Sequence, residues 1–140
     1  MKKIEIGTIA VDQNKTIKTI TLGTLRLKTE YTIELFTSRE GDYIAHFHII
    51  PKNRSKSVVC VKLYEAAYFK HGDKDGTLNA DECTKLNEFL NKKCTLSENK
   101  DFNYNNWQFM VYKWRQSHNE PCSKDIIEKL SKPDYTTITE

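Results

Sequence analysis

Two histidines one residue apart are the first feature of this sequence that suggests chemistry. His46 and His48 flank Phe47 in the segment "HFHI". If this segment is a strand, residues two apart point to the same face, so the two imidazoles lie side by side. The pair can act as acid and base in RNA cleavage, or can chelate a metal ion if His71 or Asp73 supplies a third ligand. The simpler interpretation is structural, with each ring hydrogen-bonded to backbone or to tyrosine on a partly covered face.

The segment 71–82, "HGDKDGTLNADE", has the spacing of a calcium-binding loop. Asp73 and Asp75 fall at the third and fifth positions of such a loop, and Glu82 falls at the twelfth, bidentate position. Calcium binding is therefore one alternative function, with His71, Asp73, Asp75 and Glu82 as the candidate ligands.

Two features argue against calcium. The first position of the loop is His71, where a hard cation needs an oxygen ligand, and the segment before it begins as a strand rather than a helix. Asn79 and Glu82 also have the spacing of a capping box, which would occupy the Glu82 carboxylate. We therefore predict a turn that runs into a capped helix, with no tight calcium binding and no assigned metal.

A third candidate is the aromatic segment 103–116, "NYNNWQFMVYKWRQ". As a helix it must turn one apolar stripe to the core, and Phe109 and Tyr112 fall outside that stripe. Exposed aromatic rings beside Lys113 and Arg115 suit a protein interface or the stacking of bases. The alternative is that a thin sheet needs wide coverage from this helix, which would bury the same rings.

The charge pattern is a mild excess of positive residues, with a formal net charge of +3. A dedicated nucleic-acid binder usually shows a clustered basic patch, and the local cluster here is Lys52, Arg54 and Lys56. We interpret this cluster first as a solvated turn between strands. Phosphate binding by Lys52 or Arg54 is the alternative.

The cysteines and the apolar segments bear on the compartment. The four cysteines are Cys60, Cys83, Cys94 and Cys122, and none forms a Cys-x-x-Cys pair. A domain of this length needs no disulfides, so we expect free thiols and no cysteine zinc site. The sequence shows neither a secretory signal nor a run approaching the ~18 apolar residues of a membrane span. These patterns predict a cytoplasmic protein that binds no membrane, and no cofactor is expected.

The elements that must position these residues are strands in the first half of the chain. Alternating apolar residues predict strands at 2–11, 16–28, 31–38, 43–50 and 57–65. The apolar phase flips around Gly23, which predicts a bulge, and Gly41 allows a turn. Short loops between successive strands favour an antiparallel sheet of about five strands within residues 2–65.

The second half of the chain has a helical period. Helices are predicted over 77–93 and 105–116, and a short third helix follows Ser123. Strands followed by helices without alternation indicate an α+β fold, with two or three helices packing on one face of the sheet. We expect one domain over residues 1–140, with a loose C-terminal tail from about residue 131.

Four segments occur in an order that resembles a family of small bacterial and phage proteins of unknown function. They are "GDYIAHFHI", "VVCVKLYE", "DGTLNADECTKLNEFL" and "NNWQFMVYKW", and the match as a whole covers about residues 31–116. The family carries a His-Phe-His strand preceded by a proline pair, which Ile44 and Ala45 replace here. Its members are often found near toxin–antitoxin or mobile-element genes. The resemblance implies the fold, the pairing of His46 with His48, and a bacterial cell or the host of a phage as the location.

The function predicted from these features is that of a small non-enzymatic accessory protein that binds a protein partner. The helix with Phe109 and Tyr112 and the sheet edge would form the binding surface, and an open edge would also allow a homodimer. One alternative is a toxin-like ribonuclease, with His46 and His48 as acid and base and Lys52 or Arg54 holding phosphate, so nucleic acid is an alternative partner. Calcium binding through 71–82 is the other alternative.

Overall fold

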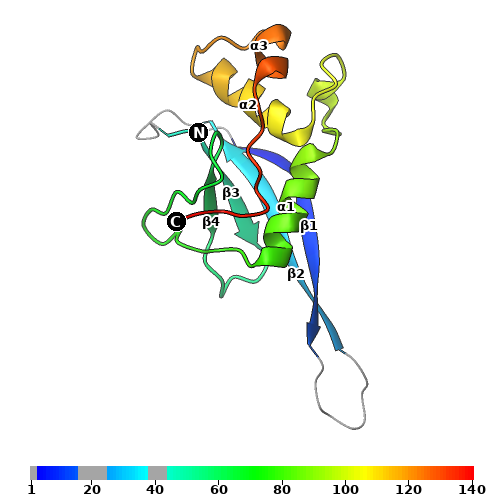
Figure 1. The fold of residues 1–140 in the computed structure, drawn as a ribbon, viewed down its shortest axis with the longest axis vertical. Coiled ribbons are helices and arrows are strands. Elements are labelled where there is room, and N and C mark those ends of the chain that lie inside the picture. Colours follow the sequence, from blue (N-terminus) through cyan, green and yellow to red (C-terminus); the bar gives the residue numbers. More distant parts are fainter. Residues whose placement is uncertain (1–2, 16–24, 38–43) are drawn as a thin grey trace.

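A computed structural model describes residues 3–15, 25–37 and 44–140 and shows an α+β fold (Figure 1). Four antiparallel strands form one sheet in the order β1-β2-β3-β4. They are β1 (Lys3–Lys15), β2 (Leu25–Phe36), β3 (His46–Pro51) and β4 (Val59–Lys62). Each strand pairs with its neighbours in sequence, as expected for a meander whose connections are short.

The sheet has four strands where about five were expected. Residues 25–36 form the single strand β2, although the sequence pattern divided them between the segments 16–28 and 31–38. The expected bulge at Gly23 and the expected turn at 39–42 lie outside the described residues. A register shift does occur in β1, between Glu5 and Gly7. At Gly7 an added Cβ would lie 2.7 Å from the ring of Phe89, which belongs to helix α1 (Ala80–Asn91), so a larger residue there would require this ring to move.

Three α-helices and a short 3₁₀ helix follow the sheet. They are α1 (Ala80–Asn91), η1 (Ser97–Asn99), α2 (Asn106–Ser117) and α3 (Lys124–Lys129). The predicted capping box of α1 is confirmed, because the Glu82 N–H donates to the Asn79 side chain and the Asn79 N–H donates to the Glu82 carboxylate. Within the described residues, no helix combines the length and the apolar character needed to cross a membrane.

One apolar core joins the sheet to α1 and α2. Alternate strand residues such as Ile33, Leu35 and Phe47 are completely buried, and they share a cluster with Leu86 of α1 and Met110 of α2. Figure 1 shows α1 crossing the sheet beside β1, with α2 and α3 at one end.

The C-terminal segment is packed, so the expectation of a loose tail is wrong. Tyr135 is completely buried, and its hydroxyl lies 2.9 Å from the carbonyl oxygens of both Lys62 and Leu63. Thr139 bridges to Ala67 in parallel fashion, and Figure 1 shows the segment running back along the sheet. A buried tyrosine with a satisfied hydroxyl anchors this segment to the end of β4.

The face of the sheet opposite the core residues Ile33, Leu35 and Phe47, called the second face below, carries polar and histidine side chains. Direct partners in antiparallel strands point to the same face, and the register aligns Glu34, His48 and Cys60 in one row across β2, β3 and β4. Beyond β4 the chain continues the sheet locally, because Tyr68 bridges to Val61 and the Phe69 N–H donates to the Cys60 carbonyl at 2.9 Å. This edge segment, residues 67–71, brings a further histidine to the same face.

Candidate metal centre

Three histidines converge on the second face of the sheet. His46 and His48 come from β3 and His71 comes from the end of the edge segment, and one ring nitrogen of each lies within 4.8 Å of the others. The ring centroids are 5.2 Å apart for His46 and His48, 5.5 Å for His46 and His71, and 6.1 Å for His48 and His71. The cluster is therefore a compact set of three imidazoles from two different parts of the chain.

Backbone carbonyls fix two of the three rings. His46 Nδ1 lies 2.7 Å from the Ile44 carbonyl oxygen, and His71 Nδ1 lies 3.0 Å from the Phe69 carbonyl oxygen. A carbonyl only accepts, so both Nδ1 atoms carry the hydrogen and donate it. The lone pair of each neutral ring is then on Nε2. Metal-ligating histidines usually show this arrangement, in which the second N–H is held by a carbonyl or carboxylate.

His48 is the most perturbed base of the cluster. Only 7% of its surface is exposed. Burial lowers its pKa from 6.5 to about 4, and the positive charges of His46, His71 and Lys74 act in the same direction. His48 is therefore neutral at pH 7, which is the form that coordinates metal ions. Neither of its ring nitrogens has a hydrogen-bond partner among the described residues.

Aromatic rings enclose the cluster. Phe36 lies 4.5 Å from the His48 ring, Phe69 lies 4.7 Å from the His46 ring, and Trp114 of α2 lies 6.3 Å from the His46 ring. An apolar shell of this kind limits access of solvent and lowers the local dielectric, which strengthens interactions with a bound cation.

The sequence expectations for this cluster are met in part. The structure brings His71 to His46 and His48, as the metal alternative required, whereas Asp73 is exposed and does not join the group. The structural interpretation, in which every ring bonds to backbone or tyrosine, holds for His46 and His71. It does not hold for His48.

The 71–82 segment is a turn leading into a capped helix, as predicted. Glu82 is buried, and it also accepts a hydrogen bond from the Tyr31 hydroxyl. Its two carboxylate oxygens are therefore occupied by Tyr31 and by the Asn79 backbone. Asp73 and Asp75 are exposed, and among the described residues these three carboxylates form no ligand cluster.

The aromatic helix does not expose the rings as expected. Phe109 is 1% exposed, so its placement on a free surface is wrong; the helix buries a wide arc, which was the alternative. Lys113 is also buried and pairs with Glu98 at 2.5 Å. Tyr112 is half-buried against Phe102, and the Arg115 guanidinium donates to the Tyr64 hydroxyl at 3.0 Å.

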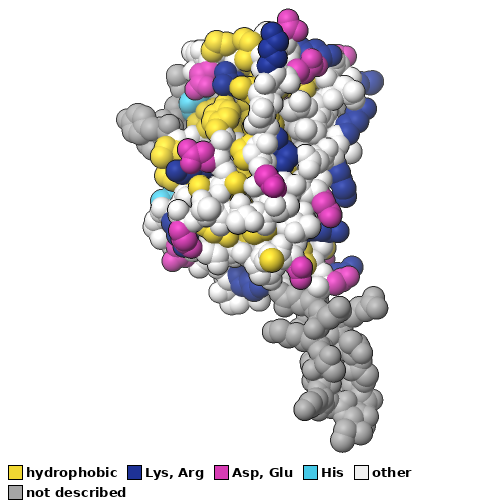
Figure 2. All heavy atoms as spheres, viewed as in Figure 1, with side chains coloured by type: hydrophobic (Ala, Val, Ile, Leu, Met, Phe, Trp, Pro, Cys, Tyr) yellow, Lys and Arg dark blue, Asp and Glu magenta, His cyan; other side chains and the backbone are white. Residues whose placement is uncertain are grey.

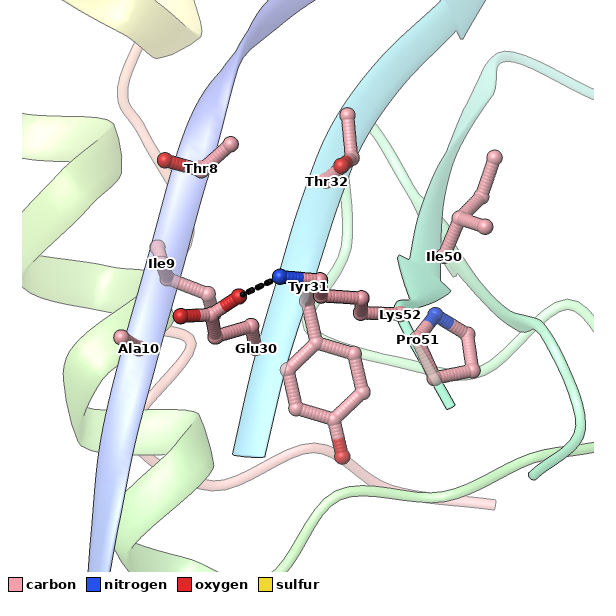
Figure 3. Close-up of a pocket in the computed structure, with 9 residues that line it drawn as sticks. All are labelled: Thr8, Ile9, Ala10, Glu30, Tyr31, Thr32, Ile50, Pro51 and Lys52. Carbon is pink, nitrogen blue, oxygen red and sulfur yellow. Dashed lines mark ion pairs between the residues drawn. The ribbon is translucent and has the colours of Figure 1, made fainter. Parts of the chain in front are cut away.

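The basic turn after β3 is exposed and is separate from the histidine cluster. Lys52 and Arg54 follow β3 at the end away from His46, and Lys52 pairs with Glu30 at 3.1 Å. Lys52 and Glu30 both line a pocket of about 420 Å³, and Figure 3 shows the ion pair in front of β2, near Ile9.

Charged side chains of both signs are mixed on one face of the molecule. On the face drawn in Figure 2, lysines and arginines are interspersed with acidic side chains. For the ribonuclease alternative, the two histidines lie together as required. The residues expected to bind phosphate, Lys52 and Arg54, follow the other end of β3.

Comparisons with protein-family models, with curated proteins and with solved structures find no match for this chain. The resemblance to the family of small bacterial and phage proteins therefore stays a prediction, together with the genomic setting that it implies. The chemistry of the site rests on the geometry of the cluster.

Proposed function

We propose that this protein binds one divalent transition-metal ion, zinc by preference, through His46, His48 and His71. The observation that carries this proposal is the approach of one nitrogen from each ring to within 4.8 Å of the others, with His46 and His48 buried and His71 partly buried. Three imidazoles are a common ligand set for zinc, whereas a hard cation such as calcium prefers oxygen ligands.

The distances are close to those of a loaded site. Zinc binds imidazole nitrogen at about 2.0–2.1 Å, which places tetrahedral ligand atoms roughly 3.3 Å apart. The ring nitrogens lie within 4.8 Å of one another, so the rings must draw together by up to about 1.5 Å to reach this spacing. The carbonyl acceptors on Nδ1 of His46 and His71 limit the rotation of these two rings and leave Nε2 as the ligand atom.

The position of the site suggests what the metal does. It would tie β3 to the edge segment 67–71, which the backbone bonds to β4 hold at few points. As part of this proposal, α1 packs on the opposite face, α2 reaches the histidine cluster through Trp114, and the metal stabilises the histidine face. The protein is then a metal-dependent, non-enzymatic module rather than a ribonuclease.

Zinc binding to the chelator-treated full chain, expressed without a histidine tag, tests the proposal. We expect one zinc per chain by isothermal titration calorimetry. Replacing a ligand should cost at least the tenfold to hundredfold known for outer-shell partners, so His48→Gln should weaken binding by about a hundredfold or more. His118→Gln is the matched control, since His118 stacks on Trp114 and lies outside the cluster. Equal affinity in the His48 and His118 variants would disprove the site.

A further inference from the structure

We propose that the thiolate of Cys60 is the fourth ligand, so that the centre is a closed three-histidine, one-cysteine zinc site. This inference rests on the proposed zinc binding and adds the residue that completes the coordination. It follows from where β4 lies between the strands that carry the histidines.

Cys60 lies on the same face of the sheet as His48. His48 and Cys60 are direct partners across β3 and β4, so their side chains share a face. On the other side of β4, the Phe69 N–H donates to the Cys60 carbonyl, and His71 follows two residues later. His48 and His71 therefore approach each other from opposite sides of β4, and Cys60 projects from the strand between them.

The burial and chemistry of Cys60 suit this role. The residue is 1% exposed, and its partner His48 is 7% exposed. Thiolate and imidazole together form many four-coordinate structural zinc sites. A thiolate also supplies the negative charge that three neutral imidazoles lack, which lowers the cost of placing a divalent cation among Phe36, Phe69 and Trp114.

The competing ligand on the same row is Glu34. It is the partner of His48 on β2, so it lies on the side of β3 away from β4 and His71. Its carboxylate also pairs with Lys3 at 3.4 Å. Both facts favour Cys60 over Glu34 as the group that closes the site.

Coordination requires a small movement and the loss of one proton. The Cys60 sulfur is not among the atoms lying within 4.8 Å of one another, so the thiol must move toward the rings as the metal enters. The zinc–sulfur bond replaces the S–H bond, and the proton passes to the buffer. Wild type should therefore release one proton more per zinc than a variant without this thiol.

Cobalt(II) is the spectroscopic probe for the experiment, because it takes zinc sites and reports sulfur ligation. We expect the cobalt-loaded chain to show tetrahedral visible bands together with a near-ultraviolet sulfur-to-cobalt charge-transfer band. Cys60→Ser and Cys60→Ala should both lose the charge-transfer band. Cys83→Ser, which changes another buried thiol in the core, should keep it.

The outcomes separate this inference from the proposed function. Cobalt bands without charge transfer in wild type would overturn the cysteine ligand while leaving the histidine site intact. A charge-transfer band that persists in both Cys60 variants would overturn it as well, by assigning the sulfur elsewhere. Absence of zinc and cobalt binding would remove both proposals. Thermal melts in the presence of chelator test whether the Cys60 variants fold. If these variants do not fold, calorimetry of the wild type in two buffers counts the protons released per zinc.

Discussion

His48 and Cys60 face each other across β3 and β4, as direct partners in antiparallel register. Their side chains lie on the face of the sheet opposite the core residues Phe47 and Val61. The imidazole of His71 reaches the same face from beyond β4. A metal ion bound here would therefore link three neighbouring parts of the sheet, and the predictions below follow from this arrangement and from the packing around it.

Zinc should raise the thermal stability of the chain. A ligand that binds only the folded state adds about 2.7 kcal/mol at a free concentration about a hundred times its Kd. For a domain of this size that corresponds to a rise in Tm of roughly 5–10 °C. Differential scanning fluorimetry with buffered zinc would measure the shift. The shift should vanish in His71→Ala and persist in His118→Gln; an equal shift in both variants would contradict the site.

Stability of the metal-free protein should fall in mildly acidic solution because of His48. Its pKa is about 4 in the folded chain against an ordinary value of 6.5. Below pH 6.5 the His48 side chain binds a proton in the unfolded chain but not in the folded chain. The contribution of neutral His48 to the free energy of unfolding is therefore complete above pH 6.5 and is lost as the pH falls toward 4. One such group changes the free energy of unfolding by at most about 1.4 kcal/mol per pH unit.

Urea denaturation in the presence of chelator, from pH 7.5 to 4.5, measures this slope. His48→Gln should flatten the curve between pH 6.5 and 4.5. An equally steep loss of stability in the His48 variant would assign the pH dependence to other groups.

Glu82→Ala should destabilise the protein by roughly 0.5–2 kcal/mol, the usual cost of losing a cap interaction. The cost should be the same with and without calcium, because the carboxylate is held by the Asn79 N–H and the Tyr31 hydroxyl. Glu82→Gln keeps an acceptor at the capping position and should cost less. A calcium-dependent rise in Tm that disappears in Glu82→Ala would instead establish the loop as a calcium site.

Tyr135→Phe should cost about 1–3 kcal/mol, since it removes the hydroxyl that donates to the Lys62 carbonyl and leaves the Leu63 carbonyl with the Trp107 Nε1–H alone. Chemical denaturation would measure the loss. Thr136→Ala is the matched control, because Thr136 is exposed and bonds locally to Asp134. No change in the Tyr135 variant would show that the C-terminal segment adds little to the fold.

Local patterns predicted the helices well. The capping residues Asn79 and Glu82 mark the start of α1 in the sequence, and the structure contains both hydrogen bonds. The short helix after Ser123 is also present. The strand number was harder to predict, since the alternation of apolar residues does not show that residues 25–36 continue as one strand.

The candidate site could be predicted only in part. The spacing of His46 and His48 placed two imidazoles on one face, and the sequence offered His71 or Asp73 as the third ligand without choosing between them. The choice depends on the pairing of the edge segment with β4, which is a long-range contact. The same register places Cys60 beside His48, and no sequence spacing between residues 48 and 60 indicates this.

Side-chain exposure on α2 was the least predictable property. Phe109 lies outside the main apolar stripe of its helix, yet it is buried, because surrounding segments cover a wide arc of the helix. Periodicity identifies which residues share a face, but tertiary packing decides how many faces are covered.

The most direct test of the metal centre is anomalous diffraction at the zinc edge from crystals of the zinc-loaded full chain. We expect one strong anomalous peak on the second face of the sheet, about 2.0–2.1 Å from a ring nitrogen of His48 and from Nε2 of His46 and His71. A zinc-loaded crystal with no peak between these three rings would contradict the proposed metal centre.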